Sequence, residues 1–169
     1  SYKEAVELAF YGASIIHPKT IQPLHEKHIK LRVRSFYHLQ HAGSLVEDLE
    51  KTDSQKPSVI VKKNQVLLSL IPHDFSFMDA KNMGIVFQIL SKHHHQINLL
   101  QNSAISFSVC LDDNSSHFDA LILELQVYFK LRYNRNHVLV TIRHYHPQVV
   151  EKIYAQVHFK KSISNLGFT

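Results

Sequence analysis

The hydrophobic pattern is clearest in the middle of the chain. A short apolar run at residues 66–71 stops at Pro72, which predicts a strand. Apolar residues then recur at spacings of three and four, as on one buried face of a helix. They are Met83, Val86, Phe87 and Leu90. Residues 97–100 predict a short strand, and the strict alternation of residues 105–111 predicts another.

The following segment repeats the helix and the strand. Its helical stripe consists of Phe118, Leu121, Ile122 and Leu125. Ser116, followed by Asp119, predicts the cap of this helix, and residues 138–142 predict a further strand. The order is strand, helix, strand, strand, helix, strand. This order predicts an α+β fold in which both helices cover one face of an antiparallel sheet, and it does not by itself indicate a function.

The first part of the chain contains fewer elements. Ser1 with Glu4 forms a capping box at the start of a helix, and Pro18 suits the first position of a second helix. Residues 29–35 alternate between apolar and polar positions, which predicts a half-buried strand. A segment of about 45 residues with a single strand cannot bury a core of its own. We therefore expect it to complete a larger domain.

Two stretches mark the boundaries of these units. Residues 47–58 have almost no apolar content after Leu49 and contain Pro57, which predicts a linker. Pro147 begins a further short helix, and residues 157–159 predict a strand. Too few residues then remain for a second complete α+β unit. The last segment is expected to borrow a strand, for which residues 59–63 are the natural donor, or to pair with another chain.

Composition narrows the class of protein. Of the 169 residues, 44% are apolar and 20% charged, and no apolar run approaches the ~18 residues of a membrane span. The single Cys110 fits a reducing cytoplasm. The net charge of +5 is scattered, and Phe107 stands alone on its strand where an RNA-binding sheet would present paired aromatics. We expect a cytoplasmic protein that binds neither nucleic acid nor membrane.

Histidine is common, with 14 copies. The run from His93 to His95 cannot converge on one metal ion, because consecutive helical residues point about 100° apart. His144 and His146 would share a strand face, but no further ligands accompany them. We therefore expect no metal site.

Several motifs, in order, resemble the aspartokinase family. Residues 1–5 and 11–20 are similar to the pattern S-Y/F-x-E-A followed by G-A-K-V-L-H-P. Residues 29–36 resemble the strand written IPxRVxSF, and residues 43–46 resemble the G-T-x-I/V that ends the kinase domain. The segments 64–68, 86–90 and 97–111 look like the first ACT domain of such an enzyme.

The resemblance implies a division of the chain. Residues 1–46 would be a remnant of the amino-acid-kinase domain, and residues 47–58 the linker. Residues 59–145 would be the first ACT domain, a ferredoxin-like βαββαβ unit. Residues 146–169 would be a partial second ACT unit, with residues 59–63 as its pairing strand.

The resemblance also implies a function. Such a chain would be the regulatory part of an aspartokinase, sensing lysine or threonine, forming a homodimer and controlling ATP-dependent phosphorylation of aspartate in lysine, threonine and methionine biosynthesis. The family's phosphate-binding loop, K-x-G-G-T/S, does not occur here. We therefore expect no catalytic residue and no cofactor in this fragment, with ATP and magnesium held by a missing N-terminal kinase domain. Ser14 and Ile15 would lie near that ATP.

The effector site implied by the resemblance comes from the loop before the first ACT helix and from the second strand with its turn. It comprises Met78, Asp79, Lys81, Asn82, Ile97, Asn98, Asn102 and Ser103. Lysine-sensing relatives have a glycine near Lys81, an aspartate at Asn98 and a glutamate at Ala104. Because a buried ligand ammonium needs a carboxylate, we expect lysine to bind weakly or not at all. The alternative is an ACT module that dimerises edge to edge without a ligand.

Overall fold

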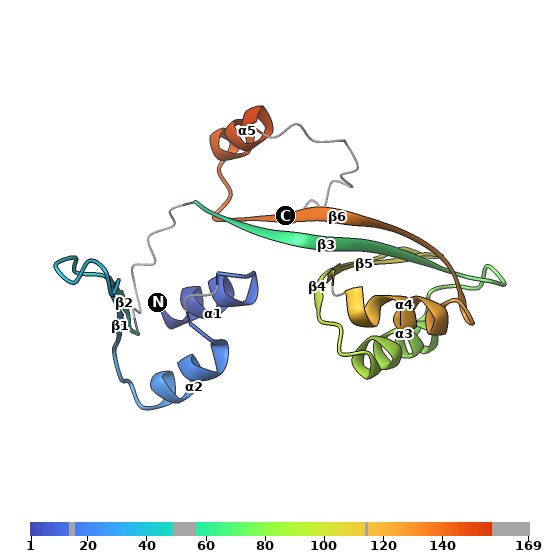
Figure 1. Cartoon of the computed structure of the whole chain (residues 1–169), viewed down its shortest axis with the longest axis horizontal. Coiled ribbons are helices and arrows are strands. Elements are labelled where there is room, and N and C mark those ends of the chain that lie inside the picture. The colour runs from blue at the N-terminus through green and yellow to red at the C-terminus, as the bar shows by residue number, and fades with distance from the viewer. Residues whose placement is uncertain (14–15, 49–56, 114, 157–169) are drawn as a thin grey trace.

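The computed structural model describes residues 1–13, 16–48, 57–113 and 115–156 (Figure 1). It has two parts, a small N-terminal unit and a four-stranded sheet with two helices. The two longest strands of the sheet extend beyond it as a two-stranded ribbon toward the N-terminal unit (Figure 1).

The N-terminal unit contains α1 (Tyr2–Phe10), α2 (Pro18–Glu26), β1 (Leu31–Val33) and β2 (Ser44–Val46). The predicted starts of these two helices are confirmed, since Ser1 Oγ accepts the Glu4 N–H at 3.1 Å and Pro18 is the first residue of α2. Strand β1 is shorter than predicted because its only described partner is the short β2. Tyr2, Ile21 and Val46 form a small core between these elements.

The second part confirms the predicted α+β order. Its strands are β3 (Ser58–Pro72), β4 (Ile97–Asn102), β5 (Phe107–Asp112) and β6 (Phe129–Arg143). They pair antiparallel in the order β4-β5-β3-β6, and α3 (Ala80–Lys92) and α4 (Ser115–Leu125) lie on one face (Figure 1). This is the ferredoxin-like topology of an ACT unit.

The core lies between the sheet and the two helices. Alternate residues of β3 and β5 point into it because successive strand residues face opposite sides. These are Val66, Leu68, Leu70, Phe107, Val109 and Leu111. They pack against the predicted helical stripes, including Val86 and Leu90 of α3 and Phe118 and Leu121 of α4. The periodicity thus identified both helices and most of the core, but Phe87 of the predicted stripe is 41% exposed and lies at the edge of the helix face.

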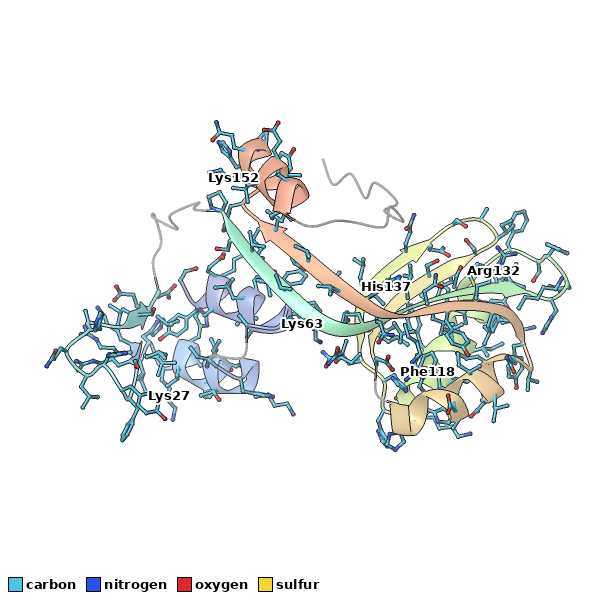
Figure 2. All side chains as sticks on the ribbon, turned by 45° about the horizontal axis from the view of Figure 1, so that its top comes forward. Lys27, Lys63, Phe118, Arg132, His137 and Lys152 are labelled. Carbon is cyan, nitrogen blue, oxygen red and sulfur yellow. The ribbon has the colours of Figure 1, made fainter. Side chains whose placement is uncertain are left out.

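Strand β3 corrects two expectations from the sequence. Residues 59–61 and 66–71 belong to one strand of 15 residues, because the polar stretch between them forms a β-bulge instead of ending the strand. The bulge contains Asn64, whose φ is 55°, and the paired register shifts between Lys62 and Gln65. Lys63 and His137 mark the place where the ribbon continues into the sheet (Figure 2).

The partner of this first stretch also differs from the expectation. Residues 58–62 pair with residues 139–143 of β6, which itself begins much earlier than the predicted strand at 138–142. Within the described residues, the partner is therefore the end of β6 and not the segment that begins at residue 146. Of the predicted linker, Ser58 already belongs to β3, and residues 49–56 lie outside the described residues.

The last described element is α5 (Pro147–Gln156), as predicted. It lies on the opposite side of the ribbon from α1 (Figures 1 and 2). The strand predicted at residues 157–159 lies outside the described residues. Among the helices that the structure describes, none is long and apolar enough to cross a lipid bilayer.

Candidate functional site

Part of the predicted effector set meets at the loop end of the sheet. The backbone N–H of Met78, in the loop between β3 and α3, donates to the carbonyl of Ala104, in the β4–β5 hairpin, at 2.9 Å. This bond places Met78 and Asp79 beside Asn102 and Ser103. The side chain of Met78 is buried in the core.

The polar side chains of this loop are already engaged within the protein. Asp79 caps α3, with Oδ1 accepting the Asn82 N–H at 2.9 Å. The amide Nδ2 of Asn82 donates to the Phe77 carbonyl at 2.9 Å and to Ser76 Oγ at 3.3 Å. Lys81 is exposed in the first turn of α3. The loop is therefore held in one shape, and Asp79 and Asn82 build it.

The hairpin is also rigid. The N–H of Ser103 donates to the Ser106 carbonyl at 2.8 Å, and the N–H of Ser106 donates to Ser103 Oγ at 3.1 Å. The two hydroxyls are 2.7 Å apart. Asn102 and Ser103 remain exposed to solvent beside this turn. The Ser103 hydroxyl is engaged with Ser106, whereas the Asn102 side chain could accept or donate hydrogen bonds to a small polar ligand.

Large apolar side chains are exposed on the loops at this end. They form what we call the loop-end surface, which consists of Phe75, Phe77, Ile105, Val127 and Tyr128. Phe75 and Phe77 are 65% and 71% exposed. The ammonium of Lys130 stands 4.5 Å from the Phe75 ring centroid, and the His73 ring contacts the Gln126 carbonyl at 3.0 Å. Sequence reasoning missed this surface, although Phe-Ser-Phe between polar residues is a readable signal.

Asn98 lies at the other end of β4. At about 3.3 Å per residue, four positions separate it from Asn102 by roughly 13 Å. Ile97 pairs opposite Leu111 and packs against the core. The predicted effector residues thus divide into two groups, one at the loop end and one at the junction with the ribbon.

The junction holds a polar network on the sheet face that no described helix of the ACT unit covers. We call Lys62, Gln65, Asn98 and Asp112 the Lys62 cluster. The Lys62 ammonium donates to Asn98 Oδ1 at 2.8 Å and to Asp112 Oδ2 at 3.1 Å, and it lies 2.9 Å from Asp112 Oδ1. Asn98 Nδ2 donates to Gln65 Oε1 at 2.7 Å and to Asp112 Oδ1 at 3.0 Å. Sequence reasoning did not identify Lys62, Gln65 or Asp112.

The electrostatics of the cluster favour a charged Asp112. Burial opposes its ionisation, but hydrogen bonds from Gln65, Lys62 and Asn98 outweigh this effect and lower the pKa of its carboxyl group. Gln65 is fully buried, and its Nε2 donates to Asp112 Oδ1 at 2.8 Å. Burial raises the pKa of the neighbouring Cys110 thiol, which keeps the thiol protonated. Asn98 therefore faces an ammonium that belongs to the protein itself.

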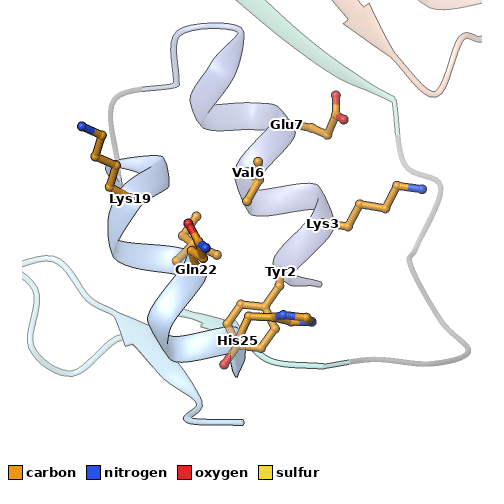
Figure 3. A pocket seen from close by; sticks show the side chains of 8 residues that line it. Tyr2, Lys3, Val6, Glu7, Lys19, Gln22 and His25 are labelled. Carbon is orange, nitrogen blue, oxygen red and sulfur yellow. The ribbon is translucent and has the colours of Figure 1, made fainter. Parts of the chain in front are cut away.

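A separate pocket lies between α1 and α2. Its volume is about 510 Å³, and its lining includes Tyr2, Val6, Ile21, Gln22 and His25. Lys3 and Lys19 stand at its edges and point away from it (Figure 3). Ser14 and Ile15, the predicted ATP neighbours, lie outside the described residues, so that prediction stays untested.

Two of the histidines considered as metal ligands, His93 and His144, have carboxylate partners. His93 Nε2 contacts Glu124 Oε2 at 2.8 Å, and His144 Nε2 contacts Glu4 Oε2 at 3.2 Å. Within the described ranges, no group of three or more His, Cys, Asp or Glu side chains is arranged to hold a metal ion.

Sequence comparisons show aspartokinases. No protein-family model matches the chain. It is 28% identical over 117 residues to the lysine-sensitive aspartokinase 3 of Escherichia coli (strain K12), a match that covers 69% of this chain and 26% of that protein. It is 27% identical over 113 residues to the chloroplastic aspartokinase 1 of Arabidopsis thaliana, covering 66% and 20%. The chain thus spans about a quarter or less of the length of these relatives.

Solved structures agree. E. coli aspartokinase III in complex with lysine and aspartate matches with a TM-score of 0.68 and 27% identity, over 83% of this chain and 32% of that one. The aspartate kinase of Clostridium acetobutylicum matches with a TM-score of 0.73 at 19% identity, over 91% and 38%, which supports the fold. The fold defines an ACT-type regulatory unit. The chain is a relative of the aspartokinases and corresponds to their C-terminal regulatory part.

Proposed function

We propose that this chain is the regulatory part of an aspartokinase that senses an amino acid and controls ATP-dependent phosphorylation of aspartate. The main support is the joint presence of a complete ACT unit and a preceding helical unit in a chain similar to aspartokinases. ATP and magnesium would be bound by a kinase domain outside these residues. Lysine, threonine and methionine biosynthesis is the pathway that such an enzyme would serve.

The two candidate effectors differ in how well they suit the site. Lysine would bring a second ammonium toward Asn98, where the Lys62 ammonium already lies 2.8 Å away. The ammonium of a bound lysine beside Asn98 would be repelled by the Lys62 ammonium. The carboxylate of Asp112 already balances the charge of Lys62. Threonine has a neutral side chain that the exposed Asn102 could hydrogen-bond. Threonine is therefore the better fit of the two.

A homodimer through the ACT units is part of the proposal. The loop-end surface supports it, because five large apolar side chains are displayed there on loops fixed by hydrogen bonds. Exposed apolar surface on a rigid scaffold is typical of an association site.

The second candidate, a dimerisation module without a ligand, is favoured by one observation. Hydrogen bonds within the protein already occupy the polar side-chain groups of three predicted effector residues, Asp79, Asn82 and Asn98.

Titration calorimetry and light scattering separate these candidates. The regulatory proposal predicts a binding heat with L-threonine, a much weaker one with L-lysine, and a dimeric mass. A dimer that gives no heat with either amino acid would favour the ligand-free module. A monomer that binds neither amino acid would contradict both. In the same preparation, ATP and aspartate should yield no aspartyl phosphate, and product formation would refute the assignment as a regulatory fragment.

A further inference from the structure

Arg143 joins two parts of the chain that lie 139 positions apart in sequence. Its Nε and Nη2 donate to the two carboxylate oxygens of Glu4 at 3.1 and 2.7 Å, and its Nη1 donates to Glu7 Oε2 at 2.8 Å. His144 contacts the same Glu4 carboxylate at 3.2 Å. Glu4 and Glu7 lie one turn apart on the same face of α1, so one guanidinium spans both.

This contact is largely shielded from solvent. The side chains of Arg143 and Glu4 are only 17% and 21% exposed. The hydrogen bond from Arg143 lowers the pKa of Glu4 in spite of burial, and the bond to Glu4 raises the pKa of Arg143. Bidentate arginine–carboxylate pairs are strong and directional, and removing one partner leaves a shielded charge unbalanced. The contact therefore fixes the orientation of α1 against the end of β6.

The other end of α1 also lies close to the same face of the ribbon. Just after α1, Gly12 lies against the aliphatic stem of Lys62, where an added methyl group would stand 3.5 Å from Lys62 Cδ. The cross-strand pairs Ser58–Arg143 and Lys62–Leu139 place Arg143 and Lys62 on one face of the ribbon. Ile60 is buried on this face.

The ribbon connects these contacts to the ACT sheet without a break. Strands β3 and β6 pair continuously from Ser58–Arg143 to Lys62–Leu139 and, after the bulge, enter the four-stranded sheet. The ammonium of Lys62 contacts two other members of the Lys62 cluster, Asn98 and Asp112. A change in the position of β4 and β5 would therefore move the ribbon as a paired unit.

We propose that Arg143 is the coupling residue through which the ACT unit and the N-terminal helices move together. The purpose of this coupling rests on the proposed regulatory function, in which α1 belongs to the regulated domain. Glu4 and Glu7 receive the displacement on α1 through their bonds to Arg143. In this proposal Arg143 is a positioning residue that acts through Glu4 and Glu7.

Hydrogen–deuterium exchange of the whole chain, repeated at rising denaturant concentrations, tests the proposal. In the wild type, amides of α1 and of the ribbon should open in one cooperative step. In Arg143→Met, the α1 amides should exchange about tenfold to a hundredfold faster, as expected for lost charged hydrogen bonds, and in a step separate from the ribbon. Unchanged protection of residues 66–70 in β3 would show that the variant is folded.

The chain offers a matched control on the same strand. Arg135 also binds a carboxylate through several bonds, to Asp113 Oδ1 and Oδ2 at 3.1 and 3.0 Å, but within the ACT unit. Arg135→Met should leave α1 exchange unchanged. Arg143→Lys keeps the charge but cannot span two carboxylates, so α1 should exchange at an intermediate rate. Glu4→Gln should have a larger effect than Glu7→Gln, because Glu4 accepts two of the bonds.

The outcomes separate this inference from the proposed function. Equal α1 exchange in wild type and Arg143→Met, or equal acceleration in Arg143→Met and Arg135→Met, would overturn the coupling. If α1 exchanges separately from the ribbon in Arg143→Met, and calorimetry shows no binding heat with either amino acid, the coupling role of Arg143 stands and amino-acid sensing is refuted. If L-threonine binds and protects α1 equally in wild type and Arg143→Met, sensing stands and the coupling role of Arg143 fails.

Discussion

Strands β3 and β6 run through two different environments, and the contrast shows what each part of the pair depends on. Within the ACT unit, Leu68 of β3 lies under α3 and α4 and is fully buried. Seven residues earlier, Val61 belongs to the same strand and is 54% exposed on the ribbon. Both stretches are paired by the same kind of backbone hydrogen bonds. Backbone pairing is therefore common to both stretches, but only the stretch within the ACT unit contributes side chains to that unit's hydrophobic core.

A two-stranded ribbon alone is marginally stable in water. The ribbon between Ser58 and Lys62 therefore relies on what attaches to it. Those attachments are polar, through Arg143 on α1 and through Lys62 on Asn98 and Asp112. The stretch within the ACT unit relies on apolar packing against α3 and α4 instead. This difference predicts where substitutions should act through burial and where they should act through charge.

The largest effect is expected in the covered stretch. Leu68→Ala removes a fully buried side chain and should destabilise the chain by about 2–5 kcal/mol, through lost transfer energy and a cavity. Val61→Ala on the ribbon is the matched change and should cost no more than about 0.5 kcal/mol. Urea unfolding followed by circular dichroism measures both. Equal losses for the two variants would contradict the contrast between the stretches.

The next effect concerns association at the loop end. Replacing both Phe75 and Phe77 with Ser should weaken the proposed dimer about tenfold to a hundredfold, because exposed aromatics carry much of an interface's binding energy. Folding stability should change by less than about 0.5 kcal/mol per site, since both rings face solvent. Light scattering over a dilution series gives the dissociation constant. Val59→Ser on the ribbon is the control, and it should leave the dimer intact.

The junction between the two stretches should set the choice of ligand. Asn98→Asp alone should not create lysine binding, because the Lys62 ammonium would pair with the new carboxylate. Combined with Lys62→Met, the same change should raise lysine affinity at least about tenfold. Calorimetry with L-lysine on both variants checks this. Tight binding by the single variant would show that Lys62 does not determine the ligand.

The smallest effect is a dependence on pH at the same junction. The pKa of Asp112 is lowered in the folded chain, so its contribution is complete above the unfolded value of about 3.9 and is lost as pH falls through the folded pKa. Because its side chain is 46% exposed, solvent screening limits the contribution to about 1 kcal/mol. Asp112→Asn should therefore be less stable than wild type at pH 7. The gap between the two should close as the pH falls below the unfolded value and through the folded pKa of Asp112.

Much of the ACT unit followed from local pattern. The stripe from Met83 to Leu90 and the alternation at residues 105–111 each specify an element through neighbours close in sequence. The full lengths of β3 and β6 did not follow. The polar residues Lys62 to Gln65 look like a strand end, because only the paired strand shows that a bulge can absorb them.

The candidate site was predicted in part for the same reason. Met78 and Asp79 were expected beside Asn102 and Ser103, and the bond from Met78 to Ala104 joins those loops. Asn98 was expected in the same group, but strand geometry carries it to the opposite end of β4. The engagement of Asn98 by Lys62 was not predictable, because the two residues are 36 positions apart and meet only across the sheet.

The sequence alone determined the order of elements in the ACT unit, most of its buried helical and strand faces, the starts of α1 and α2, and the resemblance to aspartokinases, whereas β2 was not predicted. The predicted features depend on periodicity and short motifs, which act over a few residues. The tertiary structure alone decided that β3 and β6 leave the sheet as a ribbon, that Lys62 meets Asn98, and that Arg143 meets Glu4. Those features depend on the approach of distant segments, and local pattern carries no information about which charges will meet.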